Sequence, residues 1–262
     1  MLKRITPIRY NRAARSGRTA PLILTCEAPD GSTVKVFAKF SSTCDQGNIN
    51  LAREVIAACL AHDLGLPVPE AFLIEVPPQW AATLPTDQRA KIQTSSSVAF
   101  GSRVVGDQFS TWLPGQEISV RMLPVAASIF VFDGIIQNPD RRPDNPNCLV
   151  RGDEYRIFDH ELAFSHGLIL GWIPPWHVGG LKSMETNGNH IFLSSLRGRN
   201  IDFGPIRAAW AGLSHAAIER YNEALPAQWT DVARPANSAI RLVRDARDNF
   251  DAILDEVRRV LT

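Results

Sequence analysis

The first part of the chain that shows the pattern of regular structure consists of two β-rich runs separated by a turn. They cover residues 21–26 (PLILTC) and 33–40 (TVKVFAKF), and the turn residues 28–31 (APDG) lie between them. Pro-Asp-Gly between two runs of strand-forming residues is typical of a β-hairpin. Because side chains alternate along a strand, Lys39 shares a face with Phe37 and is expected to be partly covered. An edge-strand lysine in solvent is the alternative interpretation.

The next part of the chain alternates one helix with two further strands. Apolar residues spaced three and four apart predict a helix over residues 49–64, which Gly65 ends. A continuous apolar run predicts a strand over residues 71–76, and a second strand is expected over residues 97–105. Residues 77–96 are rich in Pro, Gln, Thr and charge, which indicates an excursion over the surface.

The carboxy-terminal half reads as helices around a long irregular region. Residues 118–138 are apolar almost all round, the pattern of a buried helix, and Asp133 within it is expected to find a partner. Residues 165–204 contain many glycines and prolines and form a long loop, which is usually functional or mobile. Helices are predicted over residues 216–225 and 237–261, the second with an apolar stripe that packs on its own domain.

Composition narrows the class of protein without selecting a partner. The 262 residues could form one large domain or two modest ones, with 45% hydrophobic and 21% charged residues. The formal net charge of +1 gives no general reason to expect nucleic acid or an anionic membrane as a partner. The four cysteines form no C-x-x-C pair, so reduced thiols and a cytoplasmic location are expected. No export signal or membrane span is predicted.

The stretch over residues 138–164 concentrates acids and amides next to a short predicted hairpin. Two strand-like runs, residues 147–150 and 155–157, are joined by the turn Gly152-Asp153, and the second run ends on Asp159. This arrangement brings acidic and amide side chains from both sides of the hairpin to one end of it. The order of residues therefore favours a site rather than a set of unrelated surface groups.

Three side chains of this stretch suggest phosphoryl-transfer chemistry. At one end of the hairpin, two of the residues Asp140, Asn145 and Asp159 can hold a divalent metal while the third faces a substrate hydroxyl. Upstream, Lys39 on a strand and Glu54 on the following helix stand in the order in which a kinase carries its phosphate-holding lysine and the glutamate that orients it. Taken singly, the loop could be a polar surface turn and Glu54 a solvated helix residue.

These motifs resemble the catalytic core of the HipA-like kinases, bacterial relatives of protein and phosphatidylinositol kinases. The similarity is carried by NPDRRPDNPNCLV and IFDHELAF, which match an N-x-D-R-x-x-x-N loop followed by a hairpin and a metal-binding aspartate. The resemblance implies that Asp140 accepts or orients the hydroxyl proton and that Asn145 and Asp159 hold Mg²⁺ against the phosphates of ATP. It also implies that Lys39 in FAKF binds phosphate and that Glu54 pairs with it. We expect Lys39→Met to weaken the use of ATP without unfolding the protein.

The same resemblance implies an α+β fold of the two-lobed protein kinase type. A small, β-rich amino-terminal lobe is expected over residues 1–105. A larger, mainly helical lobe, which carries the catalytic loop and the metal-binding hairpin, is expected over residues 106–262. The chain is shorter than the toxin-type HipA kinases and is expected to lack their extra amino-terminal subdomain, so a toxin role does not follow.

Two departures from the family pattern concern the nucleotide site. Arg142 stands where many relatives have the histidine of D-R-H, so no role of that histidine can be transferred. No G-x-G-x-x-G is present, and the candidate for a phosphate-covering turn is Ser16-Gly17-Arg18-Thr19. There Gly17 allows close approach of the backbone and Arg18 can meet a phosphate.

The sequence thus predicts an ATP- and Mg²⁺-dependent phosphotransferase that acts on a hydroxyl group, with a protein serine or threonine as the expected acceptor. A small-molecule kinase is one alternative, and a pseudokinase or nucleotide-binding module that transfers no phosphate is another. The residues that choose the acceptor would lie in residues 165–204. Nearby, Arg197, Arg199 and Arg207 could form a patch for an acidic substrate or be solvated separately.

Overall fold

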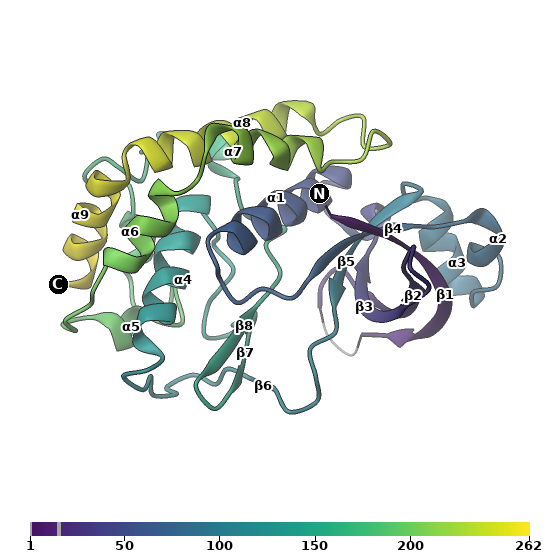
Figure 1. The fold of residues 1–262 in the computed structure, drawn as a ribbon, viewed down its shortest axis with the longest axis horizontal. Coiled ribbons are helices and arrows are strands. Elements are labelled where there is room, and N and C mark those ends of the chain that lie inside the picture. Colours follow the sequence, from purple (N-terminus) through teal and green to yellow (C-terminus); the bar gives the residue numbers. More distant parts are fainter. Residues whose placement is uncertain (1, 15–16) are drawn as a thin grey trace.

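The structure, a computed structural model, describes residues 2–14 and 17–262. Its amino-terminal part is a closed five-stranded β-barrel (Figure 1). In the order in which they pair, the strands are β1 (Lys3–Ala13), β2 (Leu22–Glu27), β3 (Thr33–Lys39), β5 (Val98–Arg103) and β4 (Ala71–Glu75). The predicted hairpin and the two later strands are thereby confirmed to within a few residues.

The barrel closes through a strand that the sequence pattern did not predict. β1 pairs antiparallel with β2 and parallel with β4, where Lys3 lies opposite Phe72. Its register is interrupted by irregularities between Pro7 and Arg9 and between Tyr10 and Arg12. The expectation that regular structure begins at residue 21 was therefore wrong, because these irregularities and the charged residues of β1 hide the usual alternation.

One end of the barrel is covered by the segment predicted as a surface excursion. Residues 77–96 contain two short helices, α2 (Pro78–Ala81) and α3 (Thr86–Gln93). Their Ala81 and Ile92 side chains are buried against the apolar interior of the barrel. The segment is thus part of the barrel's core packing as well as of its surface.

Helix α1 (Asn48–Asp63) lies between the barrel and the other helices (Figure 1). On one side, Leu51 and Val55 pack with residues of β4 and β5. On another side, Ile56 and Leu60 join the large apolar core of the helical part. The predicted helix over residues 49–64 is confirmed, and its two apolar surfaces connect both cores.

The rest of the chain packs helices around one apolar core beside a small sheet. That sheet consists of β6, β7 and β8 in this order, and Gly152-Asp153 forms the predicted turn between the last two strands. The elements are β6 (Ser110–Thr111), α4 (Leu123–Ile136), β7 (Cys148–Arg151), β8 (Glu154–Ile157), α5 (Leu193–Leu196), α6 (Gly204–Ala211), α7 (His215–Glu223), α8 (Ala233–Asp248) and α9 (Phe250–Leu261). Short 3-10 turns are η1 (Ser41–Thr43), η2 (His166–Leu168) and η3 (Lys182–Met184).

Two helical predictions need correction, and one helix of eight residues was not predicted. The buried helix predicted from residue 118 begins at Leu123, with Pro124 in its first turn, a position that proline tolerates. The single helix predicted over residues 237–261 is two helices, α8 and α9, separated at Asn249. The apolar stripe remains in phase across this residue, so the pattern alone does not reveal the break. Helix α6 was not predicted.

The predicted irregular region, residues 165–204, is anchored at several points. It has only the short elements η2, η3 and α5. However, Leu181, Met184 and Phe192 are buried in the large apolar core. The loop is therefore held to the helical part by side chains spread along its length.

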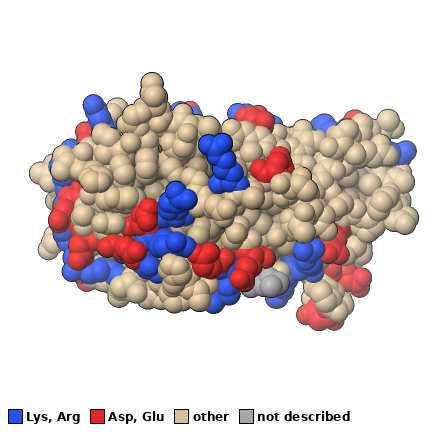
Figure 2. All heavy atoms as spheres, turned by 90° about the horizontal axis from the view of Figure 1, so that it is seen from above, with Lys and Arg blue, Asp and Glu red and all other residues tan. Residues whose placement is uncertain are grey.

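Charged side chains of both signs lie close together on the surface. Figure 2 shows acidic and basic residues alternating along one edge of the molecule, beside a broad area of other residues. Within residues 2–14 and 17–262, no helix has both the length and the apolar character that a membrane crossing requires.

Candidate active site

The last residue of β3 carries a buried lysine at the junction between the barrel and α1. Lys39 is only 8% exposed. It lies on the face of β3 opposite the barrel interior, where residues of α1 and of the segment after β8 cover it. Its Nζ atom donates to Glu54 Oε1 at 2.6 Å, Asp159 Oδ1 at 2.5 Å and Glu161 Oε2 at 2.8 Å. Strand, helix and the segment after β8 therefore meet at one ammonium group.

The charges of this cluster stabilise one another against burial. Burial disfavours the charged form of Lys39, but the carboxylates of Glu54, Asp159 and Glu161 outweigh it and raise its pKa well above the usual value. Burial raises the pKa of Glu54, an effect that Lys39 partly offsets. Burial opposes ionisation of Asp159 as well, yet the neighbouring Lys39 holds the pKa of that carboxyl below its ordinary value.

A backbone reversal brings both acidic residues of the IFDHELAF segment to Lys39. Asp159 has a φ of 63°, the left-handed region that aspartate tolerates better than most residues. The next backbone N–H, that of His160, donates to Glu54 Oε2 at 3.0 Å. Asn50 Nδ2 on α1 donates to the backbone oxygen of Glu161 at 2.8 Å. Helix α1 thus holds this segment at two positions one turn apart.

Glu161 is the residue of this cluster that the sequence analysis missed. It is buried, and besides Lys39 its carboxylate lies 3.7 Å from Arg18 Nη2. The one sequence signal for Glu161 was its D-x-E spacing from Asp159. This spacing places both acids beside Lys39 only because the backbone reverses at Asp159. Together, oxygen atoms of Glu54, Asp159 and Glu161 lie within 4.8 Å of one another, a donor set that hard cations such as Mg²⁺ prefer.

A second group of side chains surrounds Asp140 in the loop after α4. Asp140 Oδ2 accepts from Asn145 Nδ2 at 2.8 Å and from Asn147 Nδ2 at 3.2 Å. Its backbone N–H donates to Asn138 Oδ1 at 3.2 Å. Three amide side chains of the loop therefore fix the position and orientation of one carboxylate.

Arg141 connects this loop with the Asp159 segment and with the helix beneath them. Its fully buried guanidinium donates to Asp133 on α4, with Nε–Oδ2 at 2.5 Å and Nη2–Oδ1 at 3.2 Å. It also donates to the backbone oxygen of Asn147 at 2.5 Å and lies 3.0 Å from His160 Nε2. Since arginine only donates, His160 Nε2 accepts, which assigns the proton of this imidazole to Nδ1. Burial, followed by the charge of Arg141, lowers the pKa of His160 to about 3.

The structure brings the predicted residues together in two groups. Lys39, Glu54 and Asp159 form the first group, and Asp140 with Asn145 forms the second. The predicted shared metal position of Asn145 and Asp159 stays a prediction, because Asn145 donates to Asp140 while Asp159 is bound to Lys39.

The predicted phosphate-covering turn lies next to the first group. Gly17 has a φ of 112°, a conformation that side chains disfavour, and Arg18 pairs with Asp45 at 2.6 Å. Ser16, the first residue of that predicted turn, lies outside the described residues. Arg142, which departs from the family pattern, is partly exposed and lies 3.5 Å from Asp144.

Two of the three arginines considered as a substrate patch, Arg197 and Arg207, have separate partners. Arg197 donates to the backbone oxygen of Glu185 at 2.6 Å and to Asn187 at 3.0 Å. Arg207 pairs with Asp251 at 2.9 Å. This distribution favours separate surface contacts over one shared patch.

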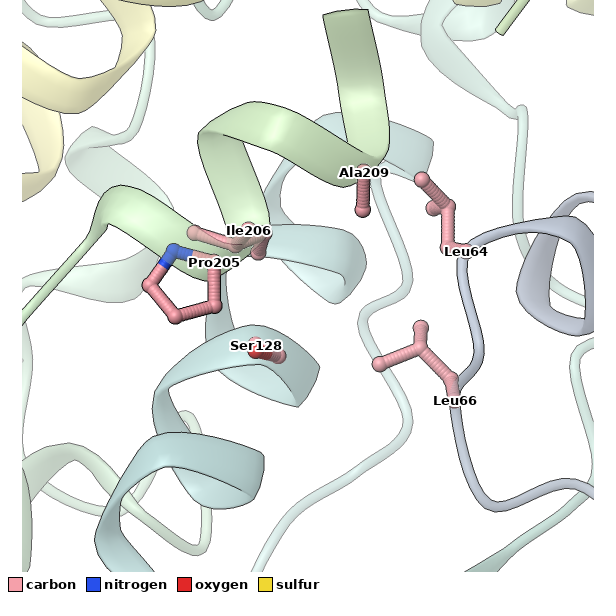
Figure 3. A pocket seen from close by; sticks show the side chains of 6 residues that line it. All are labelled: Leu64, Leu66, Ser128, Pro205, Ile206 and Ala209. Atoms are coloured by element: carbon pink, nitrogen blue, oxygen red, sulfur yellow. The ribbon is translucent and has the colours of Figure 1, made fainter. Parts of the chain in front are cut away.

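An apolar hollow of about 120 Å³ lies apart from these polar groups (Figure 3). Figure 3 shows Leu64 and Leu66, which follow α1, facing Ser128 of α4 and residues of α6 across it. Its lining offers one hydroxyl group and no charge. The candidate active site is therefore the Lys39 cluster with the Asp140 loop, and this hollow is a separate feature.

Comparisons with known proteins give one family and one fold. A family model described as HipA-like kinase matches residues 8–249. No curated protein matches the sequence. Among solved structures, the Helicobacter pylori proinflammatory kinase CtkA has a TM-score of 0.55 and 13% sequence identity, and the match covers 99% of each chain. At this identity the likeness shows a kinase-like fold, with mixed α and β structure, and nothing about substrates. The Golgi casein kinase, solved with Mn and ADP bound, has a TM-score of 0.46 and 8% identity over 98% of this chain and 74% of its own.

Proposed function

Because the chain belongs to the HipA-like kinase family, we propose that it is an ATP- and Mg²⁺-dependent phosphotransferase acting on a hydroxyl group. The proposed acceptor is a serine or threonine side chain of a protein. The observation that carries the proposal is the contact of Lys39 with both Glu54 and Asp159, at 2.6 and 2.5 Å. These residues come from distant parts of the sequence, and their meeting supports a nucleotide site of the kinase type.

We further propose that the molecule works as two lobes with the candidate site between them. Residues 1–105 would form the amino-terminal lobe and residues 106–262 the carboxy-terminal lobe. In support, the barrel and the helical part have separate apolar cores. Helix α1 would transmit movements between the lobes, since it packs on both and carries Glu54.

We assign the binding of the ATP phosphates to two cations beside the barrel, Lys39 and Arg18. Lys39 would contact phosphate oxygens of ATP, and Glu54 would keep the ammonium group oriented toward them. The backbone at Gly17 and the guanidinium of Arg18 would cover the phosphates, because Arg18 already lies over the carboxylate of Glu161. Glu161 is paired with Lys39 and Arg18, the two cations that the phosphates would contact.

Acceptor activation is assigned to the loop after α4. Asp140 would accept or orient the proton of the attacking hydroxyl, at the carboxylate that Asn145 and Asn147 hold in place. Preorganised hydrogen bonds of this kind reduce the reorganisation needed at the moment of transfer. Arg141 would keep the loop in register with the Asp159 segment, through its contacts with Asp133 and His160.

The carboxylate donors fit a divalent ion. Asp159 and Asn145 would hold Mg²⁺, and Glu161 is a further oxygen donor within reach of Asp159. When bound, Mg²⁺ neutralises charge on the phosphate oxygens. Release of Asp159 from Lys39 would free the carboxylate oxygen that now accepts from Nζ.

The test compares ATP turnover of the full-length chain with and without Mg²⁺, together with nucleotide binding. We expect Mg²⁺-dependent turnover that Asp140→Asn reduces by about 10²-fold or more, with nucleotide binding retained. Asp144→Asn is the matched control, because Asp144 lies in the same loop but is exposed. Nucleotide binding without turnover in the wild type would favour a pseudokinase or binding module. Small alcohols and protein substrates offered side by side would distinguish the two acceptor classes.

A further inference from the structure

Two arginines are buried in the part of the chain that the structure describes, and they differ in how their charge is compensated. Arg141 is fully buried and has Asp133 as a counterion. Arg53 on α1 is 7% exposed, and among residues 2–14 and 17–262 its side chain has neither an ion pair nor a hydrogen bond. Its Nε is enclosed and unpaired. An uncompensated buried guanidinium is costly, so a site that keeps one is expected to receive an anion.

A second nearly buried side chain, that of His166, also has an unpaired nitrogen. His166 in η2 is 9% exposed, and its Nδ1 has no hydrogen-bond partner among the described residues. Its Nε2 lies 3.0 Å from the hydroxyl of Ser238 on α8, which can donate to it. Nδ1 then carries the proton and is a donor without an acceptor. Burial, followed by the charge of Arg53, lowers the pKa of His166. Helix α1, which carries Arg53, packs against α8, which carries Ser238, so both side chains belong to the junction of α1, α8 and η2.

The position of these groups connects them to the candidate active site without making them part of it. On α1, Arg53 precedes Glu54 and lies one turn after Asn50, which binds the backbone oxygen of Glu161. His166 follows that segment along the chain, and Trp172 packs against its ring at a centroid distance of 4.8 Å. The imidazole of His166 is thus oriented by Trp172 and by the hydroxyl of Ser238 on α8.

From this arrangement we propose that Arg53 and His166 form a binding site for a phosphate-class oxyanion. A guanidinium presents N–H groups in a planar fork that matches two phosphate oxygens, and an imidazole N–H adds a third donor. The adjacent carboxylate of Glu54 is already paired with Lys39. Among the described residues, Arg53 Nε and His166 Nδ1 have no protein acceptor that would compete with an anion. The oxyanion could be free phosphate or a phosphoryl group on a nearby serine, Ser165 or Ser238.

The experiment measures the melting temperature of the full-length chain in inorganic phosphate and in chloride at matched ionic strength, without ATP. We expect phosphate at about ten times its dissociation constant to raise the melting temperature by about 2–5 °C. Arg53→Met should lose this response, and His166→Gln should weaken phosphate binding severalfold by calorimetry. In chloride, Arg53→Met should melt no lower than the wild type, because it removes an unpaired buried charge.

Two control variants separate this site from other cationic groups. Arg241→Met removes an exposed arginine of α8, and Arg18→Ala removes the exposed arginine of the proposed nucleotide site; both should keep the phosphate response. If Arg53→Met does not fold, Arg53→Lys and His166→Gln carry the test. Intact-mass and peptide analysis of the same protein identifies a phosphoryl group on Ser165 or Ser238, which would be the covalent source.

These outcomes decide whether the oxyanion site exists, whether or not the chain transfers phosphate. A phosphate response that survives in Arg53→Met overturns the proposal. So does a wild type that shows no response and carries no phosphoryl group at either serine. A response lost in Arg53→Met but retained in Arg18→Ala supports the site even if the chain transfers no phosphate.

Discussion

Arg141 and Asp133 form a fully buried ion pair with two contacts, Nε–Oδ2 at 2.5 Å and Nη2–Oδ1 at 3.2 Å. Asp133 also accepts from Asn138 Nδ2 at 2.8 Å and lies 3.1 Å from His190 Nε2. Burial opposes ionisation of Asp133, but Arg141 and His190 hold the pKa of its carboxyl well below the ordinary value. One carboxylate within an apolar helix therefore supports the loop that carries Asp140.

Removal of this carboxylate should destabilise the protein strongly. Asp133→Ala leaves the Arg141 guanidinium buried without a counterion, and we expect a loss of about 3–5 kcal/mol in the free energy of unfolding. Urea denaturation measures this loss. Asp251→Ala is the matched control, because it breaks an exposed pair with Arg207 and should cost less than about 1 kcal/mol. Equal losses in the two variants would contradict the role given to Asp133.

The free energy of unfolding should fall as the pH falls below the ordinary pKa of histidine. Burial lowers the pKa of His190 below 6.5, even though Asp133 opposes this change. The unfolded chain then binds a proton that the folded chain does not, so this contribution is present above pH 6.5 and is lost below it. Each such proton contributes a slope of about 1.4 kcal/mol per pH unit.

Unfolding measured between pH 8 and pH 5 in wild type and His190→Gln tests this prediction. The variant should have a smaller slope by about one proton. His62→Gln replaces an exposed histidine and should leave the slope unchanged. A wild-type slope that His190→Gln does not change would assign the dependence to other groups.

Replacement of Lys39 should affect stability as well as the use of ATP. The sequence analysis expected Lys39→Met to leave the fold intact, but the structure buries this lysine among Glu54, Asp159 and Glu161. Without it three carboxylates remain close together, and we expect a loss of about 3–5 kcal/mol at neutral pH. Because burial raises the pKa of Glu54 and Lys39 no longer offsets this effect, the loss should shrink as the pH falls toward the ordinary value of 4.5.

Two variants complete the Lys39 test by urea denaturation. Lys35→Met changes an exposed lysine on the same strand and should alter stability by less than about 0.5 kcal/mol. Glu54→Gln combined with Lys39→Met should recover part of the loss, because it removes one of the unpaired carboxylates. A Lys39→Met protein as stable as the wild type at pH 7 would contradict the mutual stabilisation described for this cluster.

Arg18→Ala should separate stability from nucleotide binding. Arg18 is largely exposed and its pairs with Asp45 and Glu161 are solvated, so we expect less than about 1 kcal/mol of change in stability. If it covers the phosphates, the affinity for ATP should fall about tenfold, as measured by calorimetry. Arg12→Ala, on the neighbouring barrel strand, should leave ATP binding unchanged. Unaltered ATP affinity in Arg18→Ala would remove this residue from the nucleotide site.

Elements with strong apolar periodicity were predictable from the sequence, and irregular ones were not. The β2–β3 hairpin, α1, α4 and the β7–β8 hairpin follow from alternation, helical spacing and turn residues. β1 was missed because its register is interrupted twice and Ile5 is its main buried apolar residue. The break at Asn249 was missed because Phe250 continues the apolar stripe of the preceding helix.

For the candidate site, the order of motifs along the chain anticipated the meeting of Lys39, Glu54 and Asp159. Glu161 could not be recognised, since its approach to Lys39 depends on the left-handed backbone of Asp159. The partners of Asp133 could not be predicted from the sequence either, although a carboxylate within an apolar helix indicated that partners must exist. Tertiary packing brings Arg53 and His166 to the same junction of the molecule. The spacing of residues along the sequence does not predict this arrangement.

The parallel pairing of β1 with β4 determines the order in which the barrel can form. The β2–β3 hairpin involves only local contacts and can form as soon as its residues are available. β1, in contrast, pairs with β4 through residues such as Lys3 and Phe72, and β5 must then be inserted between β3 and β4. During synthesis on a ribosome, closure therefore waits until Arg103 has emerged, and until then β3 and β4 each expose an unpaired edge that a chaperone could shield.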